Sequence, residues 1–583
     1  MRGPDATPQP EHNIAWHLAS AAANRPDEPA LHVPVAGRAD RTRYLTLSCA
    51  QLNLASDSTA RGLRALGLGP GARVALLTPP SEAFFVLTFA VFKAGASLVG
   101  IDPGLGAANL GRCLAEAQPH AFIGITKAHL ARRLLGWAPT ATRRIATRRL
   151  PFNRLLGVTH DLPGLLELGR SRTDLPALAS VQASDDAAIL FTSGSTGAPK
   201  GVLYSHGNFQ AQVHALRDAF GITPGEVDLC TFPLFALFAP ALGMTAVVPR
   251  MDFTRPGAVD PIEIASPVNR FHATHLFGSP ALLRRVASQD PRTPTPPMPT
   301  LRRVISAGAP AHAPTLRRFA ALLGPGACIH TPYGATEALP VCTIESREVL
   351  NETAALTAQG RGVCVGLPVG DTLVRIIPLT DGPLESGPPL THLPAGRVGE
   401  VAVSGPVVTR AYFRRDQANR HAKVIDDHGV LWHRMGDVGL IDERGRLWVC
   451  GRKSQRVVTA DRDYHSLCCE GVLDDELAPQ GLRTALVGIR LDGVTHPVAL
   501  VERGPKGPHW PPILNALLLR SEQHEATRGL MRVLRYPRRF PVDIRHNAKF
   551  GRERLAIWAA NQLRAQPAIP VNDPRHLPTE RAR

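Results

Sequence analysis

Segment 191–202 combines glycines, hydroxyl side chains and one cation directly after an apolar run. It reads Phe-Thr-Ser-Gly-Ser-Thr-Gly-Ala-Pro-Lys-Gly-Val, and residues 187–191 predict a short buried strand that leads into it. Glycine lets backbone N–H groups turn toward an anion, and hydroxyls and a lysine add donors and charge. We therefore expect a polyphosphate to bind here rather than a plain surface turn. The expected contacts are Thr192, Ser193, Gly194, Ser195, Thr196, Gly197 and Lys200.

This loop is not a Walker A motif. That motif requires Gly-x-x-x-x-Gly-Lys-Ser/Thr, whereas Pro199 precedes the lysine here and Gly201 follows it. The lysine itself is informative, because the chain has seven lysines among its 66 basic residues. A lysine at position 200, like the one at 549, indicates that a compact, mobile ammonium is needed in place of a rigid guanidinium.

Four further motifs lie downstream of this loop. Tyr333-Gly334-Ala335-Thr336-Glu337 places an aromatic ring, a hydroxyl and a carboxylate within five residues, and residues 432–437 end in an aspartate after a glycine turn. Gly451-Arg452-Lys453 and Asn547-Ala548-Lys549 follow. Each motif is weak alone, since Asp437 could form a turn and Lys549 could be a solvated surface charge. Their order and separations make them informative together.

The elements that must position these groups follow an α/β pattern. Residues 46–66 and 82–94 predict helices, whereas residues 73–78, 97–101 and 303–306 predict strands. This alternation of helices and strands is typical of a parallel sheet. Short strands split by glycine and proline from Gly362 to Val449 indicate a small β-rich subdomain. We predict an N-terminal tail (1–11), a large N-terminal domain (12–452), a small mobile C-terminal α/β domain (453–565) and a polar tail (566–583).

Composition excludes several classes of protein. The chain of 583 residues is 44% hydrophobic, which predicts a globular protein with several cores. Its formal charge of +17 comes from scattered arginines without interleaved aromatics, so we expect no nucleic-acid partner. The nine cysteines show no C-x-x-C pair, and no secretory signal is evident, so we expect a cytoplasmic protein with reduced thiols.

One charge-free segment, 229–249, is long enough to span a bilayer. Three prolines and a glycine divide it, so we expect no integral membrane segment but a buried strand, a turn and a helix. This segment is our candidate for the wall of an apolar substrate pocket, in which we place Phe235, Leu237 and Phe238.

The set of motifs resembles the adenylate-forming superfamily of acyl-CoA synthetases, luciferases and adenylation domains, over residues 12 to 560. The resemblance implies ATP and Mg²⁺, with the 192–200 loop at the β- and γ-phosphates and Glu337 as the metal ligand. It also implies that Lys200, Thr336, Glu337 and the mobile Lys549 act in catalysis, and that the chain turns on a hinge near 452–454. The adenine and α-phosphate would be bound by Gly308, Ala309, Pro310, Tyr333, Gly334 and Thr336, and the ribose by Asp437 and Arg452.

Within that superfamily, segments 231–238, 251–256, 331–337 and 540–549 resemble the β-lactone synthetases of long-chain olefin biosynthesis. Two departures from acyl-CoA synthetases agree: Val-Val-Thr-Ala-Asp at 457–461 replaces a Lys-x-x-Gly turn, and Asn547-Ala548 replaces Ser/Thr-Gly. The resemblance implies that ATP activates a 2-alkyl-3-hydroxy fatty acid, whose hydroxyl then closes a β-lactone. A fatty acyl-CoA or acyl-AMP ligase is the main alternative.

Two further expectations complete this interpretation. His206 is a candidate proton acceptor at the substrate pocket, although a lone histidine beside a loop is more often structural. The resemblance also implies association with neighbouring enzymes of hydrocarbon biosynthesis. A degenerate, non-enzymatic relative is disfavoured because Lys200, Glu337, Asp437, Arg452 and Lys549 are all present.

Overall fold

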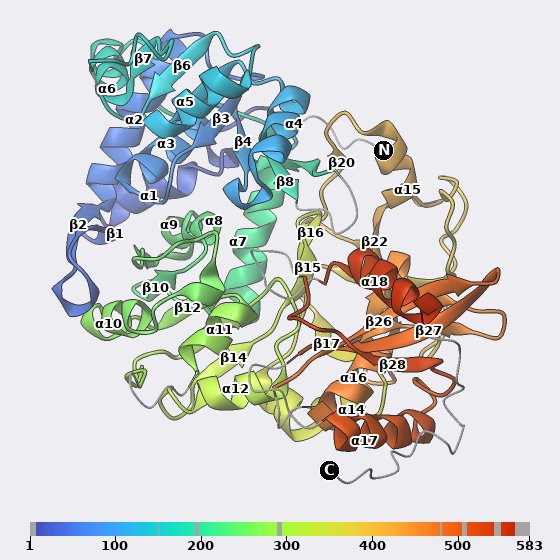
Figure 1. Ribbon diagram of the computed structural model, residues 1–583. Coiled ribbons are helices and arrows are strands. Elements are labelled where there is room, and N and C mark those ends of the chain that lie inside the picture. Colours follow the sequence, from blue (N-terminus) through green and yellow to red (C-terminus); the bar gives the residue numbers. More distant parts are fainter. Residues whose placement is uncertain are drawn as a thin grey trace.

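The computed structural model describes residues 7–149, 151–192, 198–288, 294–477, 481–503, 510–541 and 550–565. Three large sheets and a smaller C-terminal sheet organise the chain (Figure 1). The predicted α/β class, with a β-rich subdomain and a C-terminal α/β unit, is confirmed. The division after residue 452 stays a prediction.

The first sheet is mostly parallel and carries helices on both faces. Its order is β20-β9-β8-β4-β3-β5-β6-β7, with antiparallel pairing at β8–β9 and β9–β20. Helices α2 and α3 contribute to the core on one face, and α4 contributes to a separate core on the other. The strands are β3 (Arg73–Leu77), β4 (Ser97–Ile101), β5 (Ala121–Gly124), β6 (Arg143–Ala146), β7 (His160–Asp161), β8 (Asp186–Thr192), β9 (Lys200–Ser205) and β20 (Ala411–Tyr412). The helices of this region are α1 (Trp16–Asn24), α2 (Cys49–Ala65), α3 (Glu82–Lys93), α4 (Ala107–Ala117), α5 (Thr126–Leu135), α6 (Leu162–Ser171) and α7 (His206–Phe220).

The predicted helix 46–66 begins later than expected. Residues 46–48 complete strand β2, and α2 starts at Cys49 because Ser48 and Gln51 form a capping box, each side chain bonded to the other's backbone N–H. An apolar run that continues from strand into helix conceals this boundary, whereas the Ser-x-x-Gln spacing marks it.

The second sheet joins distant parts of the chain. Its order is β14-β13-β12-β10-β11-β1-β2, parallel except for the β1–β2 pair. The predicted segment 229–249 forms the end of β10, two one-turn helices and β11 rather than one longer helix, as its prolines dictate. The elements are β1 (Pro29–Ala36), β2 (Arg43–Ser48), β10 (Val227–Cys230), α8 (Pro233–Ala236), α9 (Ala239–Leu242), β11 (Thr245–Val247), α10 (Ile262–Arg270), β12 (His275–Gly278), α11 (Pro280–Val286), β13 (Arg303–Ser306), α12 (Ala313–Ala320) and β14 (Cys328–His330).

The third sheet is antiparallel, with the order β15-β16-β17-β23-β22-β19-β18, and β21 pairs with β22. It begins at Tyr333, earlier than the β-rich pattern indicated. Its elements are β15 (Tyr333–Ala335), β16 (Ala338–Thr343), α13 (Ser346–Glu348), α14 (Ala354–Ala358), β17 (Val363–Pro368), β18 (Leu373–Ile377), β19 (Gly399–Ser404), α15 (Asp416–Ala422), β21 (Lys423–Ile425), β22 (Leu431–Ile441) and β23 (Leu447–Arg452).

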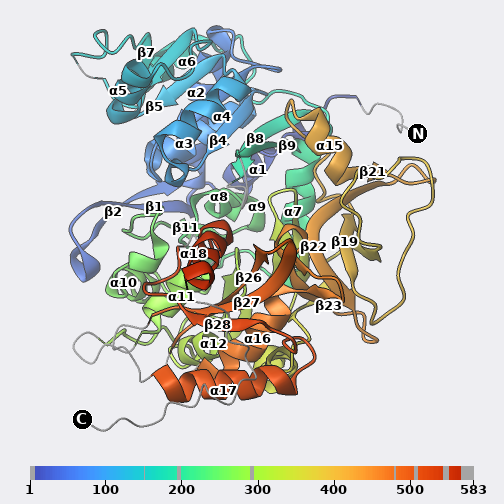
Figure 2. The same ribbon diagram turned by 45° about the vertical axis from the view of Figure 1, so that its right-hand side comes forward.

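The C-terminal unit is a three-stranded sheet between helices (Figure 2). Alternate residues of β26 and β27 face α16 and α17 on one side and α18 on the other. Its elements are β24 (Val457–Val458), β25 (Asp463–Tyr464), α16 (Ser466–Leu477), β26 (Thr484–Leu491), β27 (Val494–Val501), α17 (Trp510–Gln523), β28 (Arg532–Arg535) and α18 (Arg552–Ala565).

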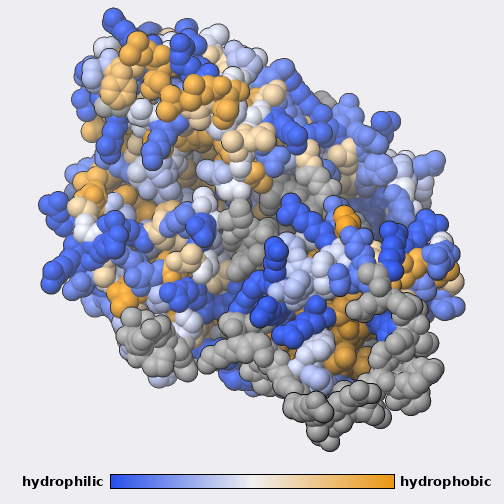
Figure 3. Space-filling view, viewed as in Figure 1, coloured by the Kyte–Doolittle hydropathy of each residue, from blue (hydrophilic) through white to orange (hydrophobic). Residues whose placement is uncertain are grey.

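The surface is mixed, with apolar side chains gathered at the top of the molecule as drawn, near α5 and α6 (Figure 3). Leu134 on α5 and Leu155, between β6 and β7, are exposed. Within the described ranges, no helix combines the length and the apolar character that crossing a bilayer requires.

Candidate active site

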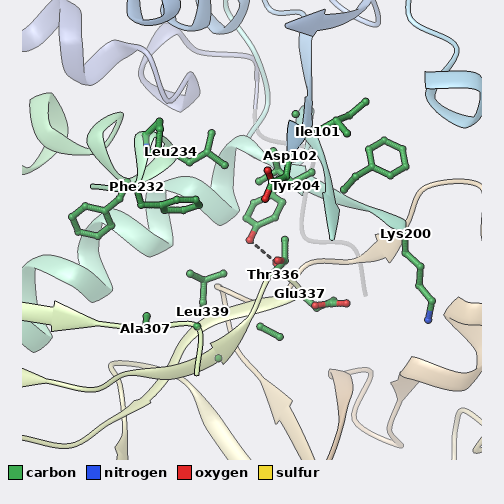
Figure 4. Close-up of a pocket in the computed structure, with 18 of the residues that line it drawn as sticks. Ile101, Asp102, Lys200, Tyr204, Phe232, Leu234, Ala307, Thr336, Glu337 and Leu339 are labelled. Carbon is green, nitrogen blue, oxygen red and sulfur yellow. Dashed lines mark hydrogen bonds between the residues drawn. The ribbon is translucent and has the colours of Figure 1, made fainter. Parts of the chain in front are cut away.

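A cavity of about 1470 Å³ lies where the three large sheets meet. The carboxyl ends of parallel strands β3, β4 and β8 border it, as do the β15–β16 hairpin, the middle of β22 and the end of β23. Ligands of open α/β sheets bind at such strand ends. Figure 4 shows Lys200, Thr336 and Glu337 at its polar part and Phe232 and Leu234 at its apolar part.

Glu337 is presented by a two-residue turn. Thr336 and Glu337 connect β15 to β16, since Ala335 pairs with Ala338 in this hairpin. Both line the cavity. The Tyr412 hydroxyl donates to Glu337 Oε1 at 2.6 Å, and the backbone N–H and hydroxyl of Thr409 donate to the Glu337 carbonyl at 2.9 and 3.0 Å. These contacts fix both the backbone and the carboxylate of Glu337.

Tyr412 remains a hydroxyl donor at ordinary pH. It is buried, and burial together with the neighbouring Glu337 carboxylate raises the pKa of its phenol. The Lys200 ammonium lies 4.9 Å from the centroid of the Tyr412 ring, within cation–π range. Tyr412 thus contacts both a carboxylate and a cation that the sequence singled out.

Asp437, Arg452 and Tyr333 form a second group. Asp437 and Arg452 are direct partners in the β22–β23 ladder, and Arg452 Nε lies 3.2 Å from Asp437 Oδ1. The Tyr333 hydroxyl donates to Asp437 Oδ2 at 2.6 Å, and burial raises the pKa of Tyr333. Asp437 lies inside β22 rather than in a turn, and the preceding Gly436 has a φ of +67°. The predicted ribose-binding pair is therefore one connected group.

The predicted phosphate loop connects two antiparallel strands. Thr192 ends β8 and pairs with Lys200, which opens β9. The predicted contacts Ser193, Gly194, Ser195, Thr196 and Gly197 lie outside the described residues, as does Lys549. Lys200, at the start of β9, lines the cavity.

The segment after β13 is only partly in contact with the cavity. Gly308, which has a φ of +99°, lines it together with Tyr333 and Gly334. Ala309 and Pro310 are not among the described residues that line it. Of the residues expected to contact the adenine, Gly308, Tyr333 and Gly334 therefore border the cavity, whereas Ala309 and Pro310 do not.

Phe235, Leu237 and Phe238 all line the apolar part of the cavity. His206 does not: it is fully buried at the start of α7, its Nδ1 accepts the Ile14 N–H at 3.1 Å, and it is not among the described lining residues. Burial lowers its pKa to about 4. The placement of His206 in the substrate pocket is therefore wrong, because the residue packs behind the cavity wall against Ile14 and the ring of Phe92.

Several cavity residues were not predicted. Tyr204 donates to the Thr336 carbonyl at 2.5 Å, and Tyr204 and Tyr412 line the cavity beside the predicted Tyr333, so that three of the six tyrosines border it. Rarity of tyrosine, like rarity of lysine, could have identified them. Lys423, near the site, is half-buried and donates to the Thr409 carbonyl, and burial of its ammonium lowers its pKa to about 7.

The junction between β23 and the C-terminal unit carries another missed contact. The Lys453 ammonium lies 2.8 Å from both carboxylate oxygens of Glu400 and 2.9 Å from the Thr380 carbonyl. Arg434 also binds Glu400, at 2.6 Å. The central residue of the predicted hinge, Lys453, is therefore held by Glu400 of the third sheet and by the Thr380 carbonyl.

This fold, with a carboxylate on a hairpin turn, a paired Asp–Arg and a lysine behind a glycine-rich loop around one cavity, defines an adenylate-forming enzyme. The chain belongs to the AMP-binding enzyme family, whose profile matches residues 18–413. It is an AMP-forming ligase.

Relatives extend over nearly the whole chain. The olefin beta-lactone synthetase of Xanthomonas campestris is 46% identical over 94% of this chain and 98% of its own length. That of Stenotrophomonas maltophilia is 45% identical with the same coverage. Among solved structures, the amide bond synthetase of Marinactinospora thermotolerans superposes with a TM-score of 0.74 at 23% identity, covering 94% of this chain and 100% of its own. That likeness supports the fold alone.

Proposed function

We propose that the protein uses ATP to convert a 2-alkyl-3-hydroxy fatty acid into an acyl adenylate, which then closes to a β-lactone. The observation that carries this proposal is one continuous cavity with carboxylate and cation groups at one part and a phenylalanine-rich wall at another. The olefin beta-lactone synthetases that share 45–46% identity with the chain support the choice of product.

In the first step the substrate carboxylate attacks the α-phosphorus, a P–O bond forms and pyrophosphate leaves. Two anions meet in this step, so cations must lie where charge develops. Lys200, at the loop, and Lys549 are the ammonium groups assigned to this task. Thr336 would contact the α-phosphate, whereas Asp437 and Arg452 would bind the ribose hydroxyls.

The residues around Glu337 fit a magnesium ion shared with the nucleotide. The described residues hold no cluster of three or more His, Cys, Asp or Glu side chains that could form an all-protein metal site. Mg²⁺ usually binds through one or two carboxylates together with substrate phosphates and waters. Glu337 supplies one such carboxylate, and the ion would neutralise charge on the phosphate oxygens.

In the second step the substrate's own hydroxyl oxygen attacks the acyl carbon. A C–O bond forms, the bond from the acyl carbon to the phosphate oxygen breaks, AMP leaves and the hydroxyl proton is released. No external thiol takes part, because a hydroxyl two carbons away is already at high effective concentration. Residues 457–464, where CoA-dependent relatives are expected to carry a Lys-x-x-Gly turn, form the tight β24–β25 hairpin. A complex with neighbouring enzymes of hydrocarbon biosynthesis would deliver and remove the insoluble chains.

The test is product analysis with ATP, Mg²⁺ and a 2-alkyl-3-hydroxy acid, with and without CoA. We expect β-lactone, AMP and pyrophosphate in both reactions. The matched acid without the 3-hydroxyl should be adenylated but give no lactone. A thioester formed only when CoA is present would overturn the proposal and favour an acyl-CoA ligase, the activity named for the feruloyl-CoA synthase of Amycolatopsis, which is 30% identical over 72% of this chain and 76% of its own length.

A further inference from the structure

The cavity extends around the carboxyl edge of the first sheet and reaches both of its faces. Successive residues of a strand point to opposite faces. Both members of three such pairs line the cavity, one pair at the end of each of β3, β4 and β8: Leu76 and Leu77, Gly100 and Ile101, and Leu190 and Phe191. The cavity therefore has one arm on each face of the sheet.

The first arm lies on the face that α3 and α7 cover. Its walls belong to the large core that contains Leu76, Phe92 and Phe235, with Phe209, Leu234 and Phe238 packed against it. This arm includes the apolar wall predicted from segment 229–249. It is the place for an alkyl chain that the sequence itself indicated.

The second arm lies on the opposite face. Its walls belong to a separate core that contains Ile101, Leu110 and Phe191, with Leu77, Ala128 and Trp137 packed against it. Pro79, Pro80, Ile125 and Ala131 extend the same lining. Local sequence patterns do not predict this arm, because its walls come from the ends of three strands and from two helices.

The lining of the second arm is that of a hydrocarbon site. Among the described lining residues from β3 to Trp137, the charged side chains are Asp102 and Lys127, and Lys127 is exposed. A polyphosphate would require several cations. A pantetheine arm would bury amides that need hydrogen-bond partners. An alkyl chain requires only apolar contact.

We infer that the two arms each take one alkyl chain of the same substrate, so that the site selects acids branched at the carbon next to the carboxyl group. The inference rests on the proposed function, and it adds that the branch is recognised by the second arm. The arms meet beside Tyr204 and Thr336, and Figure 4 shows Phe232 and Leu234 to one side of Tyr204 and Ile101 to the other. A carboxylate at this junction would lie next to the turn that carries Glu337.

The total volume of the cavity agrees with a nucleotide and a two-chain acid bound together. A cavity of about 1470 Å³ exceeds the roughly 300–1,000 Å³ of ordinary small-molecule sites. A nucleotide together with a two-chain acid is larger than one such ligand. The volume alone does not indicate that the two alkyl chains are held apart. The position of the lining residues on both faces of the sheet does.

The test compares a straight 3-hydroxy acid with a series of 2-alkyl-3-hydroxy acids that carry progressively longer 2-alkyl chains. The readout is the ratio of kcat/KM for the branched acid to that for the straight acid, measured by pyrophosphate release. In the wild type this ratio should rise about fourfold for each methylene that becomes buried. A ratio that does not rise with the length of the branch would overturn the inference.

Ala131→Trp fills the second arm from α5. If it excludes three methylenes, the ratio should fall about sixtyfold. Leu134→Trp is the matched control, because Leu134 lies on the same helix, is 74% exposed and is not among the lining residues; its ratio should equal that of the wild type. An unchanged ratio for Ala131→Trp, or an equal loss for Leu134→Trp, would overturn the inference.

Two features keep this test decisive. Ala128→Phe offers a second obstruction of the same arm if Ala131→Trp does not fold, as judged by circular dichroism. Pyrophosphate release precedes product formation, so the ratio reports on the second arm whether the product is a lactone or a thioester. Failure of the lactone proposal and failure of the two-arm inference are thus seen in different measurements.

Discussion

Tyr412→Phe should weaken the affinity of this enzyme for Mg²⁺ without abolishing its fold. The substitution removes one oxygen, the one that donates to Glu337 Oε1 at 2.6 Å. With Oε1 engaged by the phenol, the other carboxylate oxygen is presented in a fixed direction. Once the phenol is gone, the carboxylate can rotate, and a ligand for the metal that Glu337 is proposed to hold is no longer oriented.

The magnitude follows from the contact. A hydrogen bond to a charged group contributes about 1.5–3 kcal/mol, which corresponds to roughly 10- to 150-fold in a binding constant. Loss of a group that orients a metal ligand typically costs about 10- to 100-fold in metal affinity. We therefore expect the Mg²⁺ concentration for half-maximal pyrophosphate release to rise by about 10- to 100-fold at saturating ATP.

Tyr333→Phe is the matched control. It removes a hydroxyl at the same distance, 2.6 Å, from a different carboxylate, Asp437. This variant should raise KM for ATP, since Asp437 is assigned to the ribose, and should leave the Mg²⁺ requirement near that of the wild type. If both variants shift the Mg²⁺ requirement equally, or if Tyr412→Phe leaves it unchanged, the assignment of Glu337 to the metal is refuted.

Three further predictions concern stability. Burial raises the pKa of Asp474 to about 7, so the stability that its protonated form provides at low pH is lost as the pH rises from about 4 to 7. Asp474→Asn should remove this fall, on the order of 4 kcal/mol, in denaturant unfolding between pH 4 and 8. Lys93 is fully buried with its ammonium 2.6 Å from Asp57 Oδ1, so Asp57→Asn should cost about 3–5 kcal/mol at pH 6. That cost should shrink above pH 8, because burial already lowers the pKa of Lys93 to about 8, and a cost independent of pH would contradict this explanation. Gly436→Ala should cost about 1–2 kcal/mol, because its φ of +67° strains any residue with a Cβ; an unchanged unfolding midpoint would speak against that strain.

Local patterns predicted individual elements well. Strands 97–101 and 303–306 have the expected bounds, and the helix expected at 82–94 ends one residue earlier. Which strands pair with each other was harder to predict from the sequence. Strands β1 and β2 lie near the N-terminus but join the sheet of β10–β14, because β1 pairs with β11 more than 200 residues away. Nothing in the local periodicity of residues 29–48 specifies that partner.

The same distinction holds for the site. Glu337, Asp437, Arg452 and Lys200 were accessible because each stands in a short motif of unusual composition. Tyr412 was missed because its function depends on a contact with Glu337, 75 residues away. The second arm was missed for the same reason, since each of its walls reads as an ordinary core residue of its own element. His206 was wrongly placed because proximity in sequence to the loop does not determine on which side of the wall a side chain lies.

Strand β20 has a consequence for the order in which the protein is completed. Ala411 and Tyr412 pair with Leu203 and Val202 of β9, so a two-residue strand closes the edge of a sheet made some 200 residues earlier. During synthesis, domains fold as the chain emerges from its N-terminal end. The first sheet can form while Glu337 still lacks its phenol partner, and that contact can be made only after residue 412 has emerged. A nascent chain that stops before this point would contain Lys200, Thr336 and Glu337 and yet have no fixed carboxylate.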